Sequence, residues 1–132
     1  MKLYLDSSAL VKLVKREAES DALRRYLRKR GTDNRVTSAL ARDEVVRAVA
    51  GGGAVAVAHA WRQLARIDQI NLDRELLDLA ATLAPGVMLR SLDAVHLAAA
   101  RSIGSDLGAV LTYDRRMQDA AGALGLLVDA PC

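Results

Sequence analysis

The stretch Lys2-Leu3-Tyr4-Leu5-Asp6-Ser7-Ser8-Ala9-Leu10-Val11-Lys12-Leu13 decides the fold class. Its first apolar run is too short for a helix and stops at the carboxylate of Asp6. Two hydroxyl residues follow, and then apolar residues recur at helical spacing. This pattern predicts a strand, a tight turn and a helix, with Asp6 where the strand ends. In an open α/β sheet, ligands bind at the carboxyl ends of the strands.

Composition predicts one domain over residues 1–132 with an aliphatic core. The chain has 132 residues, of which 52% are hydrophobic but only 3% aromatic, and it contains no Phe. A chain of this length can bury a core of its own. Because Leu, Val, Ile and much Ala must fill that core, closely approaching helices are favoured over a β-sandwich.

Cysteine content and hydropathy predict a soluble cytoplasmic protein with no membrane partner. The only cysteine is Cys132, so an internal disulfide is excluded and a reducing compartment is favoured. Asp6 and Lys12 interrupt the first apolar run, which is therefore not a signal peptide. The longest segment without Asp, Glu, Lys or Arg runs from Ala48 to Trp61, short of the roughly 20 apolar residues that span a bilayer.

The positive charge is concentrated in one segment. The formal net charge is +3, and the sequence between Lys12 and Arg35 alone carries +5, from nine Lys or Arg and four acids. Such a local basic surface suits the binding of a polyanion, such as nucleic acid. A solvated helix face would carry the same charges, so charge alone leaves both interpretations open.

The rest of the chain alternates strand and helix patterns, which predicts a parallel sheet covered on both faces. Ser38 and Ser91 are the expected N-caps of two helices. The three glycines at 51–53 are expected to form a turn between helices, because no Lys-Ser/Thr pair of a phosphate loop follows. The further strands are predicted at 35–37, 67–72, 109–112 and 126–128. The helices are predicted at 9–15, 39–50, 54–65, 74–83, 92–100 and 115–123, with one more that begins at residue 19 or 20. Pro85-Gly86 is expected to close the helix at 74–83.

Asp6 and Asp114 share one context, since each follows an apolar strand and opens a helix. In a parallel sheet they would lie at the same edge, although each could instead be only an N-cap. Asp93 begins a helix of small apolar residues, where the helix dipole alone could explain it. A buried carboxylate also calls for a metal or a basic partner. His96 could share a metal with Asp93 or be a hydrogen-bonded core residue.

Glu44 is the fourth candidate acid. It directly follows Asp43, and helical periodicity does not decide which of the two faces inward. The alternative for Glu44 is a surface pair with Arg47. Carboxylates gathered without thiols would select a hard cation, Mg²⁺ or Mn²⁺. Such ions activate water and neutralise phosphoryl oxygens, which suits phosphodiester hydrolysis.

Four motifs, taken in order, resemble those of the PIN-domain ribonucleases, in particular VapC-type toxins of bacterial toxin–antitoxin systems. Each motif alone is weakly specific, but their order and spacing match the family over nearly the whole chain. The motifs are Leu5-Asp6-Ser7-Ser8-Ala9-Leu10-Val11-Lys12, Thr37-Ser38-Ala39-Leu40-Ala41-Arg42-Asp43-Glu44 with Arg47-Ala48, Ser91-Leu92-Asp93-Ala94-Val95-His96-Leu97-Ala98, and Leu111-Thr112-Tyr113-Asp114-Arg115-Arg116-Met117.

This resemblance implies a three-layer α/β/α domain whose acids converge at one end of a parallel sheet. It implies that Asp6, Glu44, Asp93 and Asp114 are the catalytic acids, and it selects Glu44 over Asp43. Asp6 and Asp93 would be the principal Mg²⁺ ligands, with Mn²⁺ possible. Glu44 and Asp114 would complete the shell through water or a second ion, and Ser7 and Thr112 would hold the carboxylates. His96 is usual in the motif without being a ligand.

The resemblance also implies the activity and the partners. The expected function is that of a metal-dependent endoribonuclease toxin that cleaves single-stranded or loop RNA and is inhibited by a cognate antitoxin. A homodimer is expected as well. The competing hypothesis is a non-catalytic RNA- or protein-binding domain with the same fold, whose RNA binding would be insensitive to EDTA. Another phosphoryl-transfer family is disfavoured, because Ser8 stands where a haloacid-dehalogenase motif needs a second Asp and no acidic pair precedes Asp6.

Overall fold

The computed structural model describes residues 1–83 and 89–132, which form a five-stranded parallel sheet with helices on both faces. The predicted helix end at Pro85-Gly86 lies outside the described residues. The strand order is β3-β2-β1-β4-β5, so the first strand of the chain is at the centre. The strands are β1 (Lys2–Leu5), β2 (Asn34–Ser38), β3 (Asp68–Ile70), β4 (Leu107–Leu111) and β5 (Val128–Asp129).

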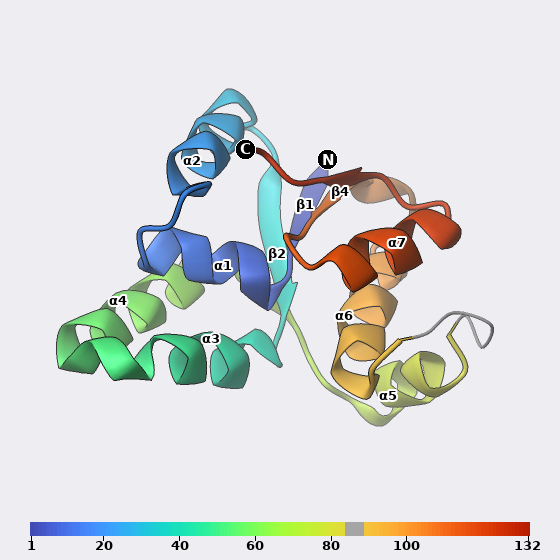
Figure 1. The fold of residues 1–132 in the computed structure, drawn as a ribbon. Coiled ribbons are helices and arrows are strands. Elements are labelled where there is room, and N and C mark those ends of the chain that lie inside the picture. The colour runs from blue at the N-terminus through green and yellow to red at the C-terminus, as the bar shows by residue number, and fades with distance from the viewer. Residues whose placement is uncertain (84–88) are drawn as a thin grey trace.

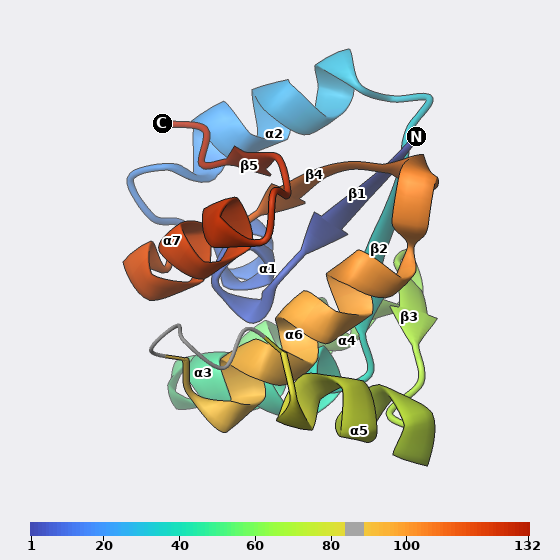
Figure 2. The same ribbon diagram turned by 90° about the vertical axis from the view of Figure 1, so that its right-hand side faces the viewer.

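Seven α-helices cover the sheet in the described part of the chain, and they divide into two layers. In Figure 1, α1, α2, α3 and α4 lie on one side of the strands and α5, α6 and α7 on the other. Figure 2 shows α6 and α7 in front of the strands and α5 beside α6. This arrangement confirms the predicted three-layer fold. The helices are α1 (Ser7–Val14), α2 (Ser20–Lys29), α3 (Ala41–Val49), α4 (Gly53–Ala65), α5 (Arg74–Ala81), α6 (Ser91–Ser102) and α7 (Arg115–Ala123).

The alternation of side chains along β1 separates two hydrophobic cores. Leu3 and Leu5 pack with buried residues of the α1–α4 layer. Tyr4 points the other way, into a core formed with α5 and α6. Successive strand residues face opposite sides of a sheet, so one apolar strand serves both layers. Because aromatic residues are scarce, alanines line much of the second core, and Ala98, Ala99 and Ala100 of α6 are all buried.

The two predicted serine caps are wrong. Ser38 is the last residue of β2, and its hydroxyl accepts a hydrogen bond from the backbone N–H of Leu40, so the next helix begins only at Ala41. Ser91 is already inside α6, whose N-cap is Arg90. A serine hydroxyl can bond to a nearby backbone group in a turn instead of capping a helix, and Ser38 does so.

The three glycines form the predicted turn between helices. Ala50–Gly52 is a short 3₁₀ segment, and α4 starts at Gly53. Gly53 has φ of 86°, a left-handed backbone conformation that glycine adopts without steric cost. Of the described helices, none has both the length and the apolar character required to cross a bilayer.

Leu5→Ala tests the central position of β1. Leu5 is fully buried beside the site-bearing end of the strand. We expect the variant to lose about 2–5 kcal/mol of unfolding free energy, because the cavity would not collapse in a packed sheet. Chemical denaturation monitored by circular dichroism measures this loss. Leu127→Ala is the matched control: Leu127 is 70% exposed, and its change should stay within about 0.5 kcal/mol.

Candidate active site

Asp6 is a buried carboxylate at the carboxyl end of the central strand. It is only 3% exposed. Its Oδ1 accepts hydrogen bonds from the Ser8 hydroxyl at 2.6 Å and from the Ala9 backbone N–H at 3.0 Å, so Asp6 is the N-cap of α1. Its Oδ2 accepts a hydrogen bond from the Thr112 hydroxyl at 2.5 Å. Burial raises the pKa of Asp6 despite these three hydrogen bonds.

Asp114 has the same relation to β4 as Asp6 has to β1. The two strands are neighbours, with Leu5 paired to Leu111, so both acids lie at the carboxyl edge of the sheet. Asp114 caps α7 through Oδ1, which accepts hydrogen bonds from the backbone N–H groups of Arg116 and Met117. Both acids therefore cap a helix, as the alternative interpretation held, and each cap uses only the Oδ1 atom. The Oδ2 atom of each acid has a partner outside its helix.

Arg90 joins Asp114 to Asp93. The guanidinium donates from Nε to Oδ2 of Asp93 at 3.1 Å and from Nη2 to Oδ2 of Asp114 at 3.2 Å. Asp93 is in the first turn of α6 and its side chain is 13% exposed, whereas that of Arg90 is 63% exposed. The basic partner that a poorly exposed carboxylate requires is thus supplied by the chain itself. Both pairs are electrostatically screened by solvent on the arginine side.

Glu44 is held by two donors on the same oxygen. Ser7 donates its hydroxyl hydrogen to Oε1 at 2.6 Å, and Nε2 of His96 lies 2.6 Å from the same atom. Burial acts to raise the pKa of Glu44, but the hydrogen bonds from His96 and Ser7 outweigh it, so this pKa lies below its usual value. Glu44 is therefore ionised at neutral pH.

The structure decides between the adjacent acids Asp43 and Glu44. Asp43 is exposed and pairs with Arg47 one helical turn on, at 2.8 Å. The surface pair that sequence patterns offered for Glu44 is thus made by Asp43. Glu44 faces Ser7 at the start of α1, on the same side as the Asp6 cap.

His96 is a buried, hydrogen-bonded residue, as one of the two sequence interpretations held. It is 2% exposed, and its Nδ1 lies 2.7 Å from the hydroxyl of Tyr4. It nevertheless touches the site, because its other ring nitrogen contacts Glu44. The role of Tyr4 was missed by the sequence patterns. A phenol in a fully buried strand needs a polar partner, and that requirement was the available signal.

The four acids are brought to one end of the sheet but not into one cluster. Consecutive residues of α1 contact two of them, Ser8 holding Asp6 and Ser7 holding Glu44. Arg90 connects the other two. Within residues 1–83 and 89–132, no group of three or more His, Cys, Asp or Glu side chains is arranged to hold a metal ion. Arg90 was also missed, although its spacing of three residues before Asp93 is that of a helical ion pair.

The donor set fits a hard divalent cation. The acids supply only carboxylate oxygens, the ligands that Mg²⁺ and Mn²⁺ favour. Asp6 has no ion-pair partner among the described residues, so its buried carboxylate is stabilised by hydrogen bonds alone and not by an opposite charge. Asp93 and Asp114 are compensated by Arg90, which a cation would have to displace.

Much of the positive charge between Lys12 and Arg35 is paired within the segment. Lys12, with only 11% of its side chain exposed, bonds to Glu17 and Glu19. Arg16 pairs with Asp21, and Arg30 lies 3.8 Å from Asp33. Five basic residues of this segment form no ion pair with the described residues, and three of them lie together on α2. The polyanion-binding interpretation is therefore strongest for these three, Arg25, Arg28 and Lys29; the other two are Lys15 and Arg35.

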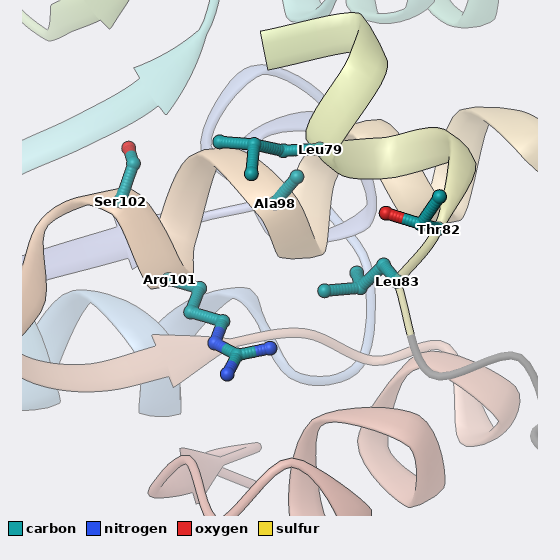
Figure 3. A pocket seen from close by; sticks show the side chains of 6 residues that line it. All are labelled: Leu79, Thr82, Leu83, Ala98, Arg101 and Ser102. Atoms are coloured by element: carbon teal, nitrogen blue, oxygen red, sulfur yellow. The ribbon is translucent and has the colours of Figure 1, made fainter. Parts of the chain in front are cut away.

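A pocket elsewhere in the molecule contains none of the four acids. It lies between α5 and α6, where Leu79 is beside Ala98 and Arg101 and Ser102 come from the end of α6 (Figure 3). Its remaining lining residues are Thr82 and Leu83. Among the described residues its lining contains no carboxylate or histidine that could serve as an acid, a base or a metal ligand, so this pocket is distinct from the candidate site at the sheet edge.

Known proteins share both the sequence and the fold. The PIN domain family model matches residues 3–123. Ribonuclease VapC46 of Mycobacterium tuberculosis is 56% identical over 129 residues, covering 98% of this chain and 97% of that protein. The crystal structure of Mycobacterium tuberculosis VapC20, a sarcin-ricin loop cleaving toxin, superposes with a TM-score of 0.76 at 19% identity, covering 98% of this chain and all of that one.

A second solved structure agrees. VapBC2 from Rickettsia felis, bound to a DNA fragment from its promoter, superposes with a TM-score of 0.73 at 12% identity over the full length of both chains. At these identities the two structures establish the fold, while the family model and the relative at 56% identity establish the family. The chain therefore belongs to the PIN-domain family and, within it, to the VapC-type ribonucleases, as its four ordered motifs predicted.

Proposed function

We propose that this protein is a Mg²⁺-dependent endoribonuclease and the toxin of a toxin–antitoxin pair, with residues 1–132 forming one nuclease domain. The observation that carries the proposal is the buried carboxylate of Asp6 at the edge where β1 and β4 end, held by three donors and paired with no cationic side chain in the described chain. A buried charge of this kind is costly unless a ligand compensates it. The ribonuclease names of the relatives support the same chemistry.

Asp6 and Asp93 would hold the metal, and Mn²⁺ could replace Mg²⁺. Such an ion, when bound, supplies a lowered pKa for bound water and charge neutralisation for phosphoryl oxygens. Glu44, ionised and reachable from solvent, would orient the attacking water. Asp114 would do the same from the β4 side. Ser8 and Thr112 fix the carboxylate of Asp6 by hydrogen bonds, which is the outer support that metal ligands need.

The substrate would be single-stranded or loop RNA, because splayed nucleotides expose the phosphate that the acids must reach. The cleaved target of VapC20 is a loop, which supports this class. Arg25, Arg28 and Lys29 would contribute phosphate contacts, which depend on salt. RNA as a substrate is consistent with action in the cytoplasm.

A cognate antitoxin would keep the enzyme inactive until needed. The VapBC2 assembly, in which a VapC chain is accompanied by VapB, supports such a partner. The antitoxin would insert a basic side chain into the site. Asp93 and Asp114 can bind such a group, because they already accept hydrogen bonds from the guanidinium of Arg90. We further propose that the protein is a homodimer.

Asp6→Asn tests the proposed activity. The amide preserves the shape of Asp6 but not its charge, so cleavage of RNA with added Mg²⁺ should fall on the order of a hundredfold or more. In EDTA the same variant should melt about 2 to 6 °C higher, because an uncompensated buried charge is removed. Gel-based cleavage assays and thermal denaturation measure the two effects. Undiminished cleavage, or growth inhibition in cells by the variant, would reject the site; RNA binding without cleavage by the wild type would favour a non-catalytic domain.

Glu44→Gln and Asp43→Asn form a matched pair. The two acids are adjacent in α3, but only Glu44 contacts Ser7 and His96. Replacing Glu44 should lower kcat about 10- to 100-fold, whereas replacing the exposed Asp43 should change it less than about twofold. Single-turnover cleavage with saturating Mg²⁺ separates this effect from binding. Equal losses in the two variants would contradict the selection of Glu44.

Arg90→Gln should strengthen metal binding. Arg90 neutralises Asp93 and Asp114, so a cation must compete with it. Since the guanidinium is largely exposed, we expect a gain of about two- to fivefold in Mn²⁺ affinity, decreasing at high salt. Isothermal titration calorimetry measures this directly. The control is Arg101→Gln in the last turn of the same helix, which should bind Mn²⁺ as the wild type does.

A further inference from the structure

Glu44 is connected to the interior of the protein by a line of three side chains. The hydroxyl of Tyr4 lies 2.7 Å from Nδ1 of His96, and Nε2 of His96 lies 2.6 Å from Oε1 of Glu44. Tyr4 is fully buried and His96 is 2% exposed, while the Glu44 side chain is 24% exposed. The line thus runs from the second core to the edge of the site, through β1, α6 and α3.

The geometry points to Tyr4 and His96 as positioning residues, which hold the water-orienting carboxylate of Glu44 by fixing His96 in its Nε2–H tautomer. This inference rests on the proposed function, because it assigns a role within the same site. Neither residue touches the reacting atoms. They act through Glu44, and the sequence motifs alone assign no such role to Tyr4.

The hydrogen-bond roles follow from the groups at each end. The ionised carboxylate of Glu44 can only accept, so Nε2 of His96 must carry the hydrogen. In a neutral ring Nδ1 is then an acceptor, and the Tyr4 hydroxyl must donate to it. A phenol is neutral at pH 7, so Tyr4 has the hydrogen that it must donate. Each bond in the line determines the direction of the next.

The two carboxylate oxygens of Glu44 have different surroundings. Both donors, Ser7 and His96, bond to Oε1. In the described part of the chain, Oε2 has no hydrogen-bond partner, and it belongs to the partly exposed end of the side chain. One oxygen is therefore anchored, and the other is free to accept a hydrogen bond from a water molecule. Loss of the anchor would let the carboxylate rotate away from that water.

Packing alone does not explain this arrangement. Tyr4 and His96 do pack edge to face, with ring centroids 5.9 Å apart and an angle of 73°. Phenylalanine at position 4 would keep that contact and fill nearly the same space. The hydroxyl adds only the bond to Nδ1 of His96, so its removal isolates the proposed role from the structural one.

Four variants test the inference by kinetics. Tyr4→Phe should lower kcat about threefold to tenfold with unchanged KM, since one buried hydrogen bond is lost. His96→Leu should lower kcat about 10- to 100-fold, as loss of outer-shell partners does. His96→Gln, whose amide can still donate to Glu44, should recover part of that loss. Tyr26→Phe is the control: it removes a phenol that bonds to Asp129, and its kcat should equal that of the wild type.

A spectroscopic measurement tests the same inference without catalysis or folding changes. The ¹⁵N shifts of the imidazole nitrogens in wild-type protein report the tautomer, and His59→Gln, which removes the other histidine, assigns the signals to His96. We expect Nε2–H in the wild type and a mixture of tautomers in Tyr4→Phe. An Nδ1–H ring in the wild type would overturn the inference, as would Tyr4→Phe with the kcat of the wild type.

The experiments distinguish a failure of this inference from a failure of the proposed function. If Asp6→Asn abolishes cleavage while Tyr4→Phe leaves kcat unchanged, the enzyme is as proposed but Tyr4 only packs, and the inference fails. If the wild-type protein cleaves no RNA with Mg²⁺ or Mn²⁺, the proposed function fails. The tautomer of His96 then still decides whether Tyr4 and His96 fix the direction of the hydrogen bond to Glu44.

Discussion

A buried carboxylate at the end of the central strand is the constraint on which the rest of the site depends. Asp6 cannot move toward solvent, because β1 is paired on both sides and its own side chain begins α1. Its charge must be stabilised where it lies, by the Ser8 and Thr112 hydroxyls and one backbone N–H. Hydrogen bonds lower the cost of such a charge without removing it. The fold thus keeps the charge of Asp6 at a cost in free energy, which a bound cation would reduce.

The charges of the other three acids are stabilised in two different ways. Glu44 is stabilised by neutral donors from Ser7 and His96. Asp93 and Asp114 share the charge of Arg90 at the solvent-facing side. Glu44 thus relies on fixed hydrogen bonds, whereas Asp93 and Asp114 use a long, exposed side chain that can leave.

The sequence predicted the architecture because its periodicities are strong. Short apolar runs ending at Asp6 and Asp114 located the central strands, and the Ala-rich run after Asp93 located α6. Periodicity failed where the decisive contacts are distant. It did not choose between Asp43 and Glu44, because the partners of Glu44 are 37 and 52 residues away. The helix start expected after Ser38 was misplaced because a serine hydroxyl can bond within a turn as well as cap a helix. At Ser91 the error was one residue, since α6 already includes it.

The strand order has a consequence for the time at which the site forms. β1 is made first but lies between β2 and β4, and Thr112, which holds Asp6, follows it by 106 residues. During synthesis the amino-terminal half can fold against one side of β1 while the other side is still unpaired. The candidate site is therefore not assembled until the segment that contains Thr112 has been synthesised. A protein harmful to its own cell would remain inert on the ribosome until nearly all of it has emerged.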